Sequence, residues 1–467
     1  MRLPRFPRLA DPGRHRRRYV KAAAAVSLLA ALPANCTFTG KLAPAPGTSH
    51  RPPVPRGAAP TTADCERTIH IACYAPAQLQ RAYDLLPLYA RNLDGRGRTI
   101  AIVDSFGSPT IRQDLATFDR DFGLSPPPSF RIIRPVGAPP PFRPTRLMAG
   151  WAFETSMDVE WAHALAPGAG ILLVETPVAE TVGVQGFPEI VKSENYVIDH
   201  NLADVISQSL GAPEATFPTR ASLLGLRSAY VSAQAHGVSV LAATGDTGPT
   251  SYRTGAMNSF FEERVTDWPA TDPLVTAVGG TMLHLDAAGA RTAPDSTWNE
   301  TVSDLPPSHL YPRASSGGRS AIFPRPDYQD GVQSVVGDAR GIPDVSMSAA
   351  AAGSVLVCAS FYHAGSCYHV GSGTSEATPE FAAVVAIADQ AAGRRLGLLN
   401  PALYRLGAAG APGLVDVTVG NNTVSFRQDG ALHVVKGWQA APGYDLATGL
   451  GTIDADRLVE ELAGTSA

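Results

Sequence analysis

The 467-residue sequence lacks a strong charge of either sign, because 38 Lys and Arg residues stand against 42 Asp and Glu, a formal net charge of −4. This near balance argues against a protein that binds nucleic acid through bulk positive charge, so we expect no nucleic-acid partner. The apolar run behind the basic N-terminus, residues 22–34, is thirteen residues long. A transmembrane helix needs roughly 20, so we expect no stable membrane span.

Cysteine is scarce. Five cysteines are present and no Cys-x-x-Cys spacing or histidine cluster accompanies them, which makes a metal site the weaker interpretation of these residues. Cys65 and Cys73 are eight residues apart, and Cys358 and Cys367 are nine apart. Two short-loop disulfides, Cys65–Cys73 and Cys358–Cys367, are therefore the natural pairing in an oxidising compartment.

The N-terminus predicts an export signal. A basic stretch ends in Arg-Arg-Arg-Tyr-Val-Lys at 16–21, directly before the apolar run, and the pattern resembles a bacterial twin-arginine signal. Leu-Pro-Ala at 32–34 offers a cleavage site. We therefore expect a secreted, extracellular protein. A lipid anchor at Cys36 is the less favoured alternative, because the residues before it fit a lipobox poorly.

The domain organisation follows from composition. We assign residues 1–34 to the signal peptide, 35–72 to a proline-rich linker and 73–467 to one folded domain, because no later linker or repeat interrupts the chain. A hydrophobic fraction of 44% provides ample core and excludes wholesale disorder. The 44 Gly and 40 Pro favour a loop-rich globular protein over a helical bundle.

Short apolar runs alternate with helical patterns. Such runs, ending in Gly, Asp or Ser, occupy residues 99–103, 170–175, 205–209 and 238–243. Helical patterns occupy residues 76–86, 152–165, 218–236 and 381–391. This alternation predicts an α/β fold with a parallel sheet buried by helices on both faces. Chemistry in such sheets collects beyond the carboxyl ends of the strands.

The first motif with chemical character is Gly-Ser-Gly-Thr-Ser-Glu-Ala-Thr-Pro at 371–379. It predicts that Ser375 lies at a helix N-terminus, where N–H groups and the dipole favour a developing negative charge. Pro379 is expected in the first helical turn, where it loses no hydrogen bond. Ser375 could act simply as a helix cap, but Gly-Thr-Ser-x-x-x-Pro is typical of subtilisin-like serine peptidases.

A serine nucleophile needs a base. The subtilisin pattern would place a His-Gly-x-His string soon after Asp104, and this sequence lacks one. An acidic helix stands in its place, with Glu154 and Asp158 four residues apart and beside an apolar stripe. Two carboxyl groups so placed can share a proton, and one of them can then serve as a general base in acid. Two unrelated surface acids are the alternative.

Asp246 follows the apolar run 238–243 within Thr-Gly-Asp-Thr-Gly. An Asp between glycines at a strand end is commonly a turn residue. If it is protonated, it can instead donate a hydrogen bond to the oxyanion of a tetrahedral intermediate, which requires low pH or a raised pKa.

Taken together, these motifs resemble the sedolisins, or serine-carboxyl peptidases, over roughly residues 73–462. Further matches are Tyr-Ala-Pro-Ala-Gln-Leu at 74–79, Ala-Pro-Gly-Ala at 166–169, Ala-Val-Gly-Gly-Thr at 277–281 and Ser-Ser-Gly-Gly at 315–318. The resemblance implies a subtilisin-like, single-domain fold and an acid-acting, monomeric serine peptidase with polypeptide substrates. It makes Ser375 the nucleophile, Glu154 the general base, Asp158 its orienting partner and Asp246 the oxyanion donor.

The resemblance also implies a calcium site near the C-terminus. The segments Asp-Val-Thr-Val-Gly-Asn at 416–421 and Ala-Pro-Gly-Tyr-Asp at 441–445 match its two halves. Calcium prefers oxygen ligands. The carboxylates of Asp416 and Asp445 and the carbonyls of Val417, Ala441 and Gly443 would supply them, whereas two ordinary turns are the alternative.

Two other functions remain open at this point. The first is a peptidase with a Ser-His-Asp triad built from Asp104 and a distant histidine such as His369. The second is a catalytically inactive, peptidase-derived binding protein. Sedolisins usually carry a long folded prodomain, and residues 35–72 leave room only for a linker, which is the best support for the binding protein. The intact catalytic positions argue against it.

Overall fold

The computed structural model describes residues 59–255, 257–301, 311–362 and 366–465. The expected signal peptide, Cys36 and most of the expected linker lie outside these residues.

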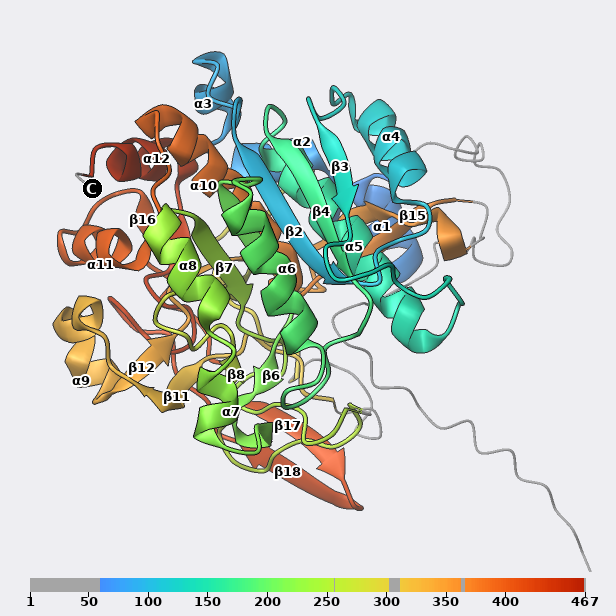
Figure 1. The fold of residues 1–467 in the computed structure, drawn as a ribbon. Coiled ribbons are helices and arrows are strands. Elements are labelled where there is room, and N and C mark those ends of the chain that lie inside the picture. Colours follow the sequence, from blue (N-terminus) through green and yellow to red (C-terminus); the bar gives the residue numbers. More distant parts are fainter. Residues whose placement is uncertain (1–58, 256, 302–310, 363–365, 466–467) are drawn as a thin grey trace, which may run out of the picture. The chain divides into compact units, whose positions relative to one another are not determined.

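An eight-stranded sheet forms the centre of the fold (Figure 1). Its strands run in the order β10-β9-β7-β5-β2-β4-β3, with β13 also paired to β9. All pairings are parallel except that of β10 with β9. The strands are β2 (Thr99–Ser105), β3 (Phe130–Ile133), β4 (Gly170–Thr176), β5 (Val205–Gln208), β7 (Ser239–Ala243), β9 (Thr276–Met282), β10 (Ser296–Thr297) and β13 (Val345–Ser348). The predicted parallel α/β architecture is confirmed.

Helices bury both faces of this sheet, as its continuous apolar strands predict. Successive side chains of a strand point to opposite faces, and in β2 Ile100 and Ile102 join one core while Ala101 and Val103 join another. Helices α5 (Arg146–Leu165) and α10 (Thr374–Ala392) pack on the first face, and α6 (Phe187–Asp199) and α8 (Ser228–His236) on the second. Figure 1 shows α6 and α8 side by side across the strands.

The remaining elements surround this core. The other helices are α1 (Thr62–Ile69), α2 (Pro76–Ala82), α3 (Leu86–Ala90), α4 (Ile111–Phe122), α7 (Arg220–Leu224), α9 (Gln333–Val336), α11 (Asn400–Ala408) and α12 (Ala455–Ala463). The other strands are β1 (Cys73–Tyr74), β6 (Ala212–Pro213), β8 (Asp267–Trp268), β11 (Gly318–Pro324), β12 (Ala339–Ile342), β14 (Ser354–Cys358), β15 (Tyr368–Gly371), β16 (Leu414–Val415), β17 (Val424–Gln428), β18 (Ala431–Val435) and β19 (Thr452–Ile453).

Two predicted helices are each divided in the structure. The helix expected over 76–86 ends at Ala82, because the chain turns through Asp84 with a φ of 56° before α3 begins. The helix expected over 218–236 is split into α7 and α8 around Gly225. The helical spacing of apolar residues continues across both breaks, so the sequence pattern does not reveal them.

The expected linker, 35–72, contains ordered structure at its end. Helix α1 lies within it and begins with a capping box, in which Thr61 and Asp64 satisfy each other's backbone N–H groups. Cys65 of this helix is fully buried and bonded to Cys73. Ordered structure therefore begins before Cys73, the expected first residue of the folded domain, because the disulfide holds α1 against it.

Both predicted disulfides are confirmed, since Cys358 is bonded to Cys367 as well. In the described part of the chain, every helix is too short or too polar to cross a lipid bilayer.

Candidate active site

Ser375 is the second residue of α10, which begins at Thr374 after Gly373. A φ of 118° at Gly373 suits glycine and turns the chain sharply from β15 into the helix. Within a helix the N–H of the second residue has no carbonyl partner, so the Ser375 N–H lies at the positive end of the helix dipole. The predicted position of Ser375 at a helix N-terminus is confirmed, and its side chain is buried.

Pro379 does not lie where the sequence analysis expected it. Because α10 begins at Thr374, Pro379 is the sixth residue of the helix and lies in its second turn. The missing proline N–H leaves the Ser375 carbonyl without a helical partner. The Ser209 hydroxyl replaces that donor and binds the Ser375 carbonyl at 3.2 Å. Pro379 thus links the serine backbone to a residue directly beyond β5.

Glu154 and Asp158 lie one turn apart on α5, and both are buried. Helices α5 and α10 pack against each other, and the Ser375 side chain lies near enough to the Glu154 carboxyl to lower its pKa. The acidic pair is therefore not an accident of the surface, since it faces the serine from the neighbouring helix.

Burial raises the pKa of Glu154, while the Ser375 side chain lowers it and the nearby Asp104 charge raises it. Burial also raises the pKa of Asp158 well above its usual range, and the charges of Asp104 and Glu154 add to that effect. Burial raises the pKa of Asp104, while the neighbouring Thr155 side chain lowers it. Three carboxyl groups thus share one buried site, and this arrangement holds protons that isolated carboxyl groups would lose.

Asp246 follows β7 and contacts the start of the serine helix. Its Oδ1 accepts hydrogen bonds from the Thr374 backbone N–H at 2.8 Å and from the Thr374 hydroxyl at 2.9 Å. Burial raises the pKa of Asp246 to about 6, against these two hydrogen bonds and the Arg313 charge. Oδ2 is buried and accepts nothing from the described residues. A proton on Asp246 therefore belongs on Oδ2, since Oδ1 already faces two donors.

The histidine alternative finds no support in this geometry. The ionisable group that lies near the Ser375 side chain is the Glu154 carboxyl. The His369 ring packs 4.9 Å from Tyr362 and 6.3 Å from Phe153, between ring centroids. His163 is buried beside Asp119, with 3.3 Å between Nε2 and Oδ1.

Three contacts at this site were missed by the sequence analysis. Asp104 was considered only for a histidine triad, although it lies next to Glu154 and Asp158. Ser209 and Thr374 were assigned no role, although they bind the Ser375 carbonyl and Asp246. Asp104 and Ser209 end or follow strands of the sheet, which is the signal that could have drawn attention to them.

The two expected halves of a calcium site lie against each other. The Gly443 N–H donates to Oδ2 of Asp416 at 2.8 Å, and the Ala441 N–H donates to Oδ2 of Asp445 at 2.9 Å. Oδ1 of Asp445 also accepts from the Ala447 and Thr448 N–H groups, each at 2.8 Å. The carbonyls of Val417, Ala441 and Gly443 accept no hydrogen bond from the described residues. Oxygen atoms of this kind are the ligands that calcium prefers. Across residues 59–465, apart from the gaps given above, no three His, Cys, Asp or Glu side chains gather for a metal.

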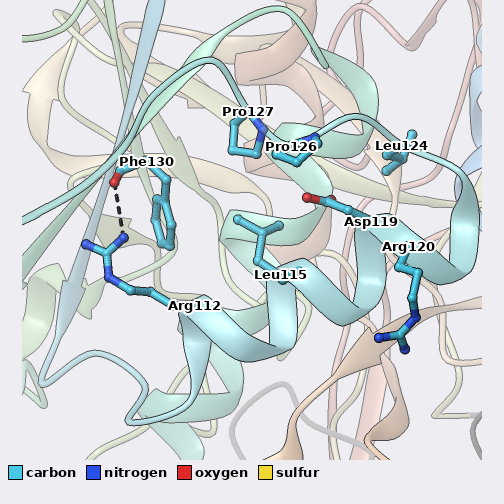
Figure 2. A pocket seen from close by; sticks show the side chains of 9 residues that line it. Arg112, Leu115, Asp119, Arg120, Leu124, Pro126, Pro127 and Phe130 are labelled. Carbon is cyan, nitrogen blue, oxygen red and sulfur yellow. Dashed lines mark hydrogen bonds between the residues drawn. The ribbon is translucent and has the colours of Figure 1, made fainter.

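A surface hollow of about 360 Å³ lies along α4, away from these groups. Figure 2 shows Leu115, Phe130 and Pro127 around it, with Arg112 donating to the Phe130 carbonyl at 3.3 Å. None of the four predicted catalytic residues lines this hollow, so it is separate from the site on α5 and α10.

Comparison with known proteins agrees with this geometry. The subtilase family profile matches residues 146–403. Kumamolisin of Bacillus sp. (strain MN-32) is 32% identical over 396 residues, which cover 83% of this chain and 63% of kumamolisin. Sedolisin of Pseudomonas sp. (strain 101) is 31% identical over 270 residues, covering 56% of this chain and 41% of sedolisin. The chain thus spans less than two thirds of the length of these curated relatives.

A solved structure of Pseudomonas sedolisin, a serine-carboxyl proteinase complexed with two molecules of pseudo-iodotyrostatin, shares the fold with a TM-score of 0.67 at 25% identity. The match covers 84% of this chain and 98% of the other, and it confirms a subtilisin-like, single-domain fold. The family profile covers more than half of the sequence, including Ser375, Glu154, Asp158 and Asp246. The predicted resemblance to the sedolisins is therefore confirmed, and the chain belongs to the subtilase family, whose sedolisin members are serine-type peptidases.

Proposed function

We propose that this protein is an exported, acid-acting serine endopeptidase that hydrolyses polypeptides through Ser375, Glu154, Asp158 and Asp246. The proximity of the Ser375 side chain to the buried Glu154 carboxyl carries this proposal. A carboxylate in that position can accept the serine proton as the hydroxyl attacks. No histidine is required, and the chemistry then depends on buried carboxyl groups that share protons.

The first half of the reaction forms an acyl-enzyme. Ser375 Oγ attacks the scissile carbonyl carbon, its proton passes to Glu154, and the carbonyl π electrons move to oxygen. As the tetrahedral intermediate collapses, the carbon–nitrogen bond breaks and Glu154 returns that proton to the leaving amine. Asp158 and Asp104 lie close enough to Glu154 for the charges of the three carboxyl groups to interact. A proton gained by Glu154 therefore relieves the repulsion among them.

The developing negative charge is stabilised by Asp246 and by the Ser375 N–H. A protonated Oδ2 of Asp246 would donate to the oxyanion, while Oδ1 remains held by Thr374. The backbone N–H at the positive end of α10 supplies a second donor. Water then attacks the acyl carbon, gives its proton to Glu154 and releases the peptide acid, and the proton returns to Ser375.

The pH dependence of hydrolysis tests this proposal. Because Asp246 must stay protonated, we expect kcat/KM for a casein-derived peptide to fall as the pH rises through about 6. Glu154 shares its protons with Asp158 and Asp104, so the loss of the first proton from this carboxyl cluster, and not the titration of Glu154 alone, sets the acid limit of activity. We therefore expect a maximum in acid when kcat/KM is measured from about pH 3 to 8.

The Asp246→Asn variant serves as the control, because an amide donates a hydrogen bond without titrating. It should retain hydrolysis and lose the alkaline decline. A maximum near neutrality would contradict the proposal and favour a histidine base. Absence of cleavage by the unaltered protein at every pH would instead leave an inactive, peptidase-derived binding protein.

Export is proposed on the N-terminal pattern, with the two disulfides in support. Disulfides persist in oxidising compartments outside the cytosol, and both pairs of cysteines are bonded. We propose release to the extracellular medium after cleavage near Ala34.

We also propose that the loops around Asp416 and Asp445 bind calcium, because their donor set consists of oxygen atoms and the loops already touch. Asp416 and Asp445 would supply charge, and the carbonyls of Val417, Ala441 and Gly443 would complete the shell. A bound ion would hold the C-terminal segment in place.

Chelation should therefore lower the melting temperature. We expect a decrease on the order of 5 °C, measured by calorimetry at pH 7.5 with and without EGTA, because an ion bound only to the folded state stabilises it. In the Asp416→Asn variant chelation should have little effect. An unchanged melting temperature in the unaltered protein would rule out the site.

A further inference from the structure

Glu300 and Arg313 lie beside Asp246 on a segment bonded directly to its loop. The Ala314 N–H donates to the Asp246 carbonyl at 2.9 Å, and the Ser316 N–H donates to the Gly245 carbonyl at 2.9 Å. The Glu300 N–H donates to the Arg313 carbonyl at 2.8 Å. Backbone hydrogen bonds thus hold the main chain of both charged residues next to the loop that carries the proposed oxyanion donor.

Their side chains pair with each other at the base of the serine helix. Arg313 Nη2 lies 3.6 Å from Glu300 Oε2 and donates to the Ser372 hydroxyl at 3.4 Å. Glu300 Oε1 accepts from the Ala352 N–H at 2.7 Å. Their side chains are 23% and 11% exposed, so solvent screens the pair only in part.

We propose that Arg313 and Glu300 are positioning residues that set the alkaline limit of catalysis through opposite electrostatic fields at the Asp246 carboxyl group. This inference rests on the proposed role of Asp246 as a protonated oxyanion donor. Neither residue would touch the reacting atoms.

The direction of each effect follows from charge. The Arg313 cation stabilises the Asp246 carboxylate and lowers its pKa, whereas the Glu300 carboxylate destabilises it and raises its pKa. Arg313 has the larger effect of the two. Other ionisable groups also face Asp246 from the elements packed around it, namely Asp267, Glu376, Tyr252 and Tyr311. Among them Arg313 supplies the positive charge that the carboxylate needs.

The pH profile of kcat/KM in four proteins tests this inference. Arg313→Gln should move the midpoint of the alkaline decline upward by about one pH unit, because Glu300 then acts unopposed. Glu300→Gln should move it downward by about half a unit. If the two effects add, the midpoint in the double variant should lie about half a unit above that of the unaltered protein. Equal displacements in one direction, or none, would overturn the inference.

Two further variants separate this outcome from a failure of the proposed function. Arg319→Gln removes an arginine whose side chain instead binds the Val335 carbonyl, and should leave the midpoint unchanged. Asp246→Asn should abolish the alkaline decline in every background. If Asp246→Asn leaves the decline intact, the proposed function has failed. If the decline disappears in Asp246→Asn but its midpoint does not move in the Arg313 and Glu300 variants, only this inference has failed. If Arg313→Gln does not fold, the inference is tested by Glu300→Gln alone, in which the midpoint of the alkaline decline should move downward.

Discussion

Replacing Ser375 with alanine should lower kcat for peptide hydrolysis by about 10⁴- to 10⁶-fold, to the residual rate that the oxyanion donors and substrate binding provide. The substitution removes the only atom that can form the acyl-enzyme, while Glu154 and Asp246 keep their places. Because α10 is capped through Thr374 and Asp246, and not through the Ser375 side chain, the fold should survive the change.

Kinetic measurements at acid pH would check this expectation, both in a single turnover with enzyme in excess and at steady state with substrate in excess. Substrate affinity should change little, because the serine hydroxyl contributes mainly in the transition state. Ser354→Ala is a matched control, since that buried hydroxyl binds only the Ala351 carbonyl and lies outside the proposed machinery. Retention of normal turnover by Ser375→Ala would refute the assignment of the nucleophile.

How far the sequence predicts this site differs from residue to residue. The i,i+4 spacing of Glu154 and Asp158 within an apolar helix is a local pattern, and it correctly indicated two buried carboxyl groups. The position of Ser375 at a helix start is local as well. Contacts between distant segments carry no such signal. The bond from Ser209 to the Ser375 carbonyl joins residues 166 positions apart and exists because Pro379 lies deeper in the helix than expected.

The same distinction applies to the fold. Continuous apolar runs predicted β2, β4, β5 and β7 and their burial on both faces, since each strand carries that information in its own residues. The end of the expected linker was misjudged because proline content says nothing about α1, which depends on the disulfide to Cys73. Arg313 was overlooked for a related reason, since its significance arises only from its proximity to Asp246.

Glu194 should make the protein less stable at neutral pH than in acid. This residue of α6 is fully buried, and its carboxyl oxygens have no hydrogen-bond partner among the described residues. Burial raises the pKa of Glu194 from 4.5 to about 8. Tyr230 of α8 lies near enough for the charge of Glu194 to raise its own pKa, which confirms that the carboxyl points into the layer between the two helices.

The sign of the effect follows from linkage. A carboxyl group whose pKa is raised by folding binds a proton more tightly in the folded state, so its full stability is present below the unfolded pKa near 4.5 and is lost as the pH rises toward 8. The difference corresponds to about 3 to 5 kcal/mol of unfolding free energy at 1.36 kcal/mol per unit. Asp246 and Asp389 change in the same direction, because burial raises their pKa values to about 6 and about 7.

Glu194→Gln should therefore leave the free energy of unfolding nearly unchanged at pH 4 and raise it by about 3 to 5 kcal/mol at pH 8. The amide has the shape and polarity of the protonated acid but cannot ionise. It therefore removes the loss of stability that accompanies ionisation of Glu194, and it adds no new contact. Urea unfolding at both pH values measures the difference. Glu189→Gln, on the same helix but only partly buried, should keep the pH dependence of the unaltered protein. An equal gain at both pH values would mean that packing, and not ionisation, is responsible. A loss of stability at pH 8 would mean that a partner compensates the Glu194 charge in the folded protein, so that burial alone does not govern its titration.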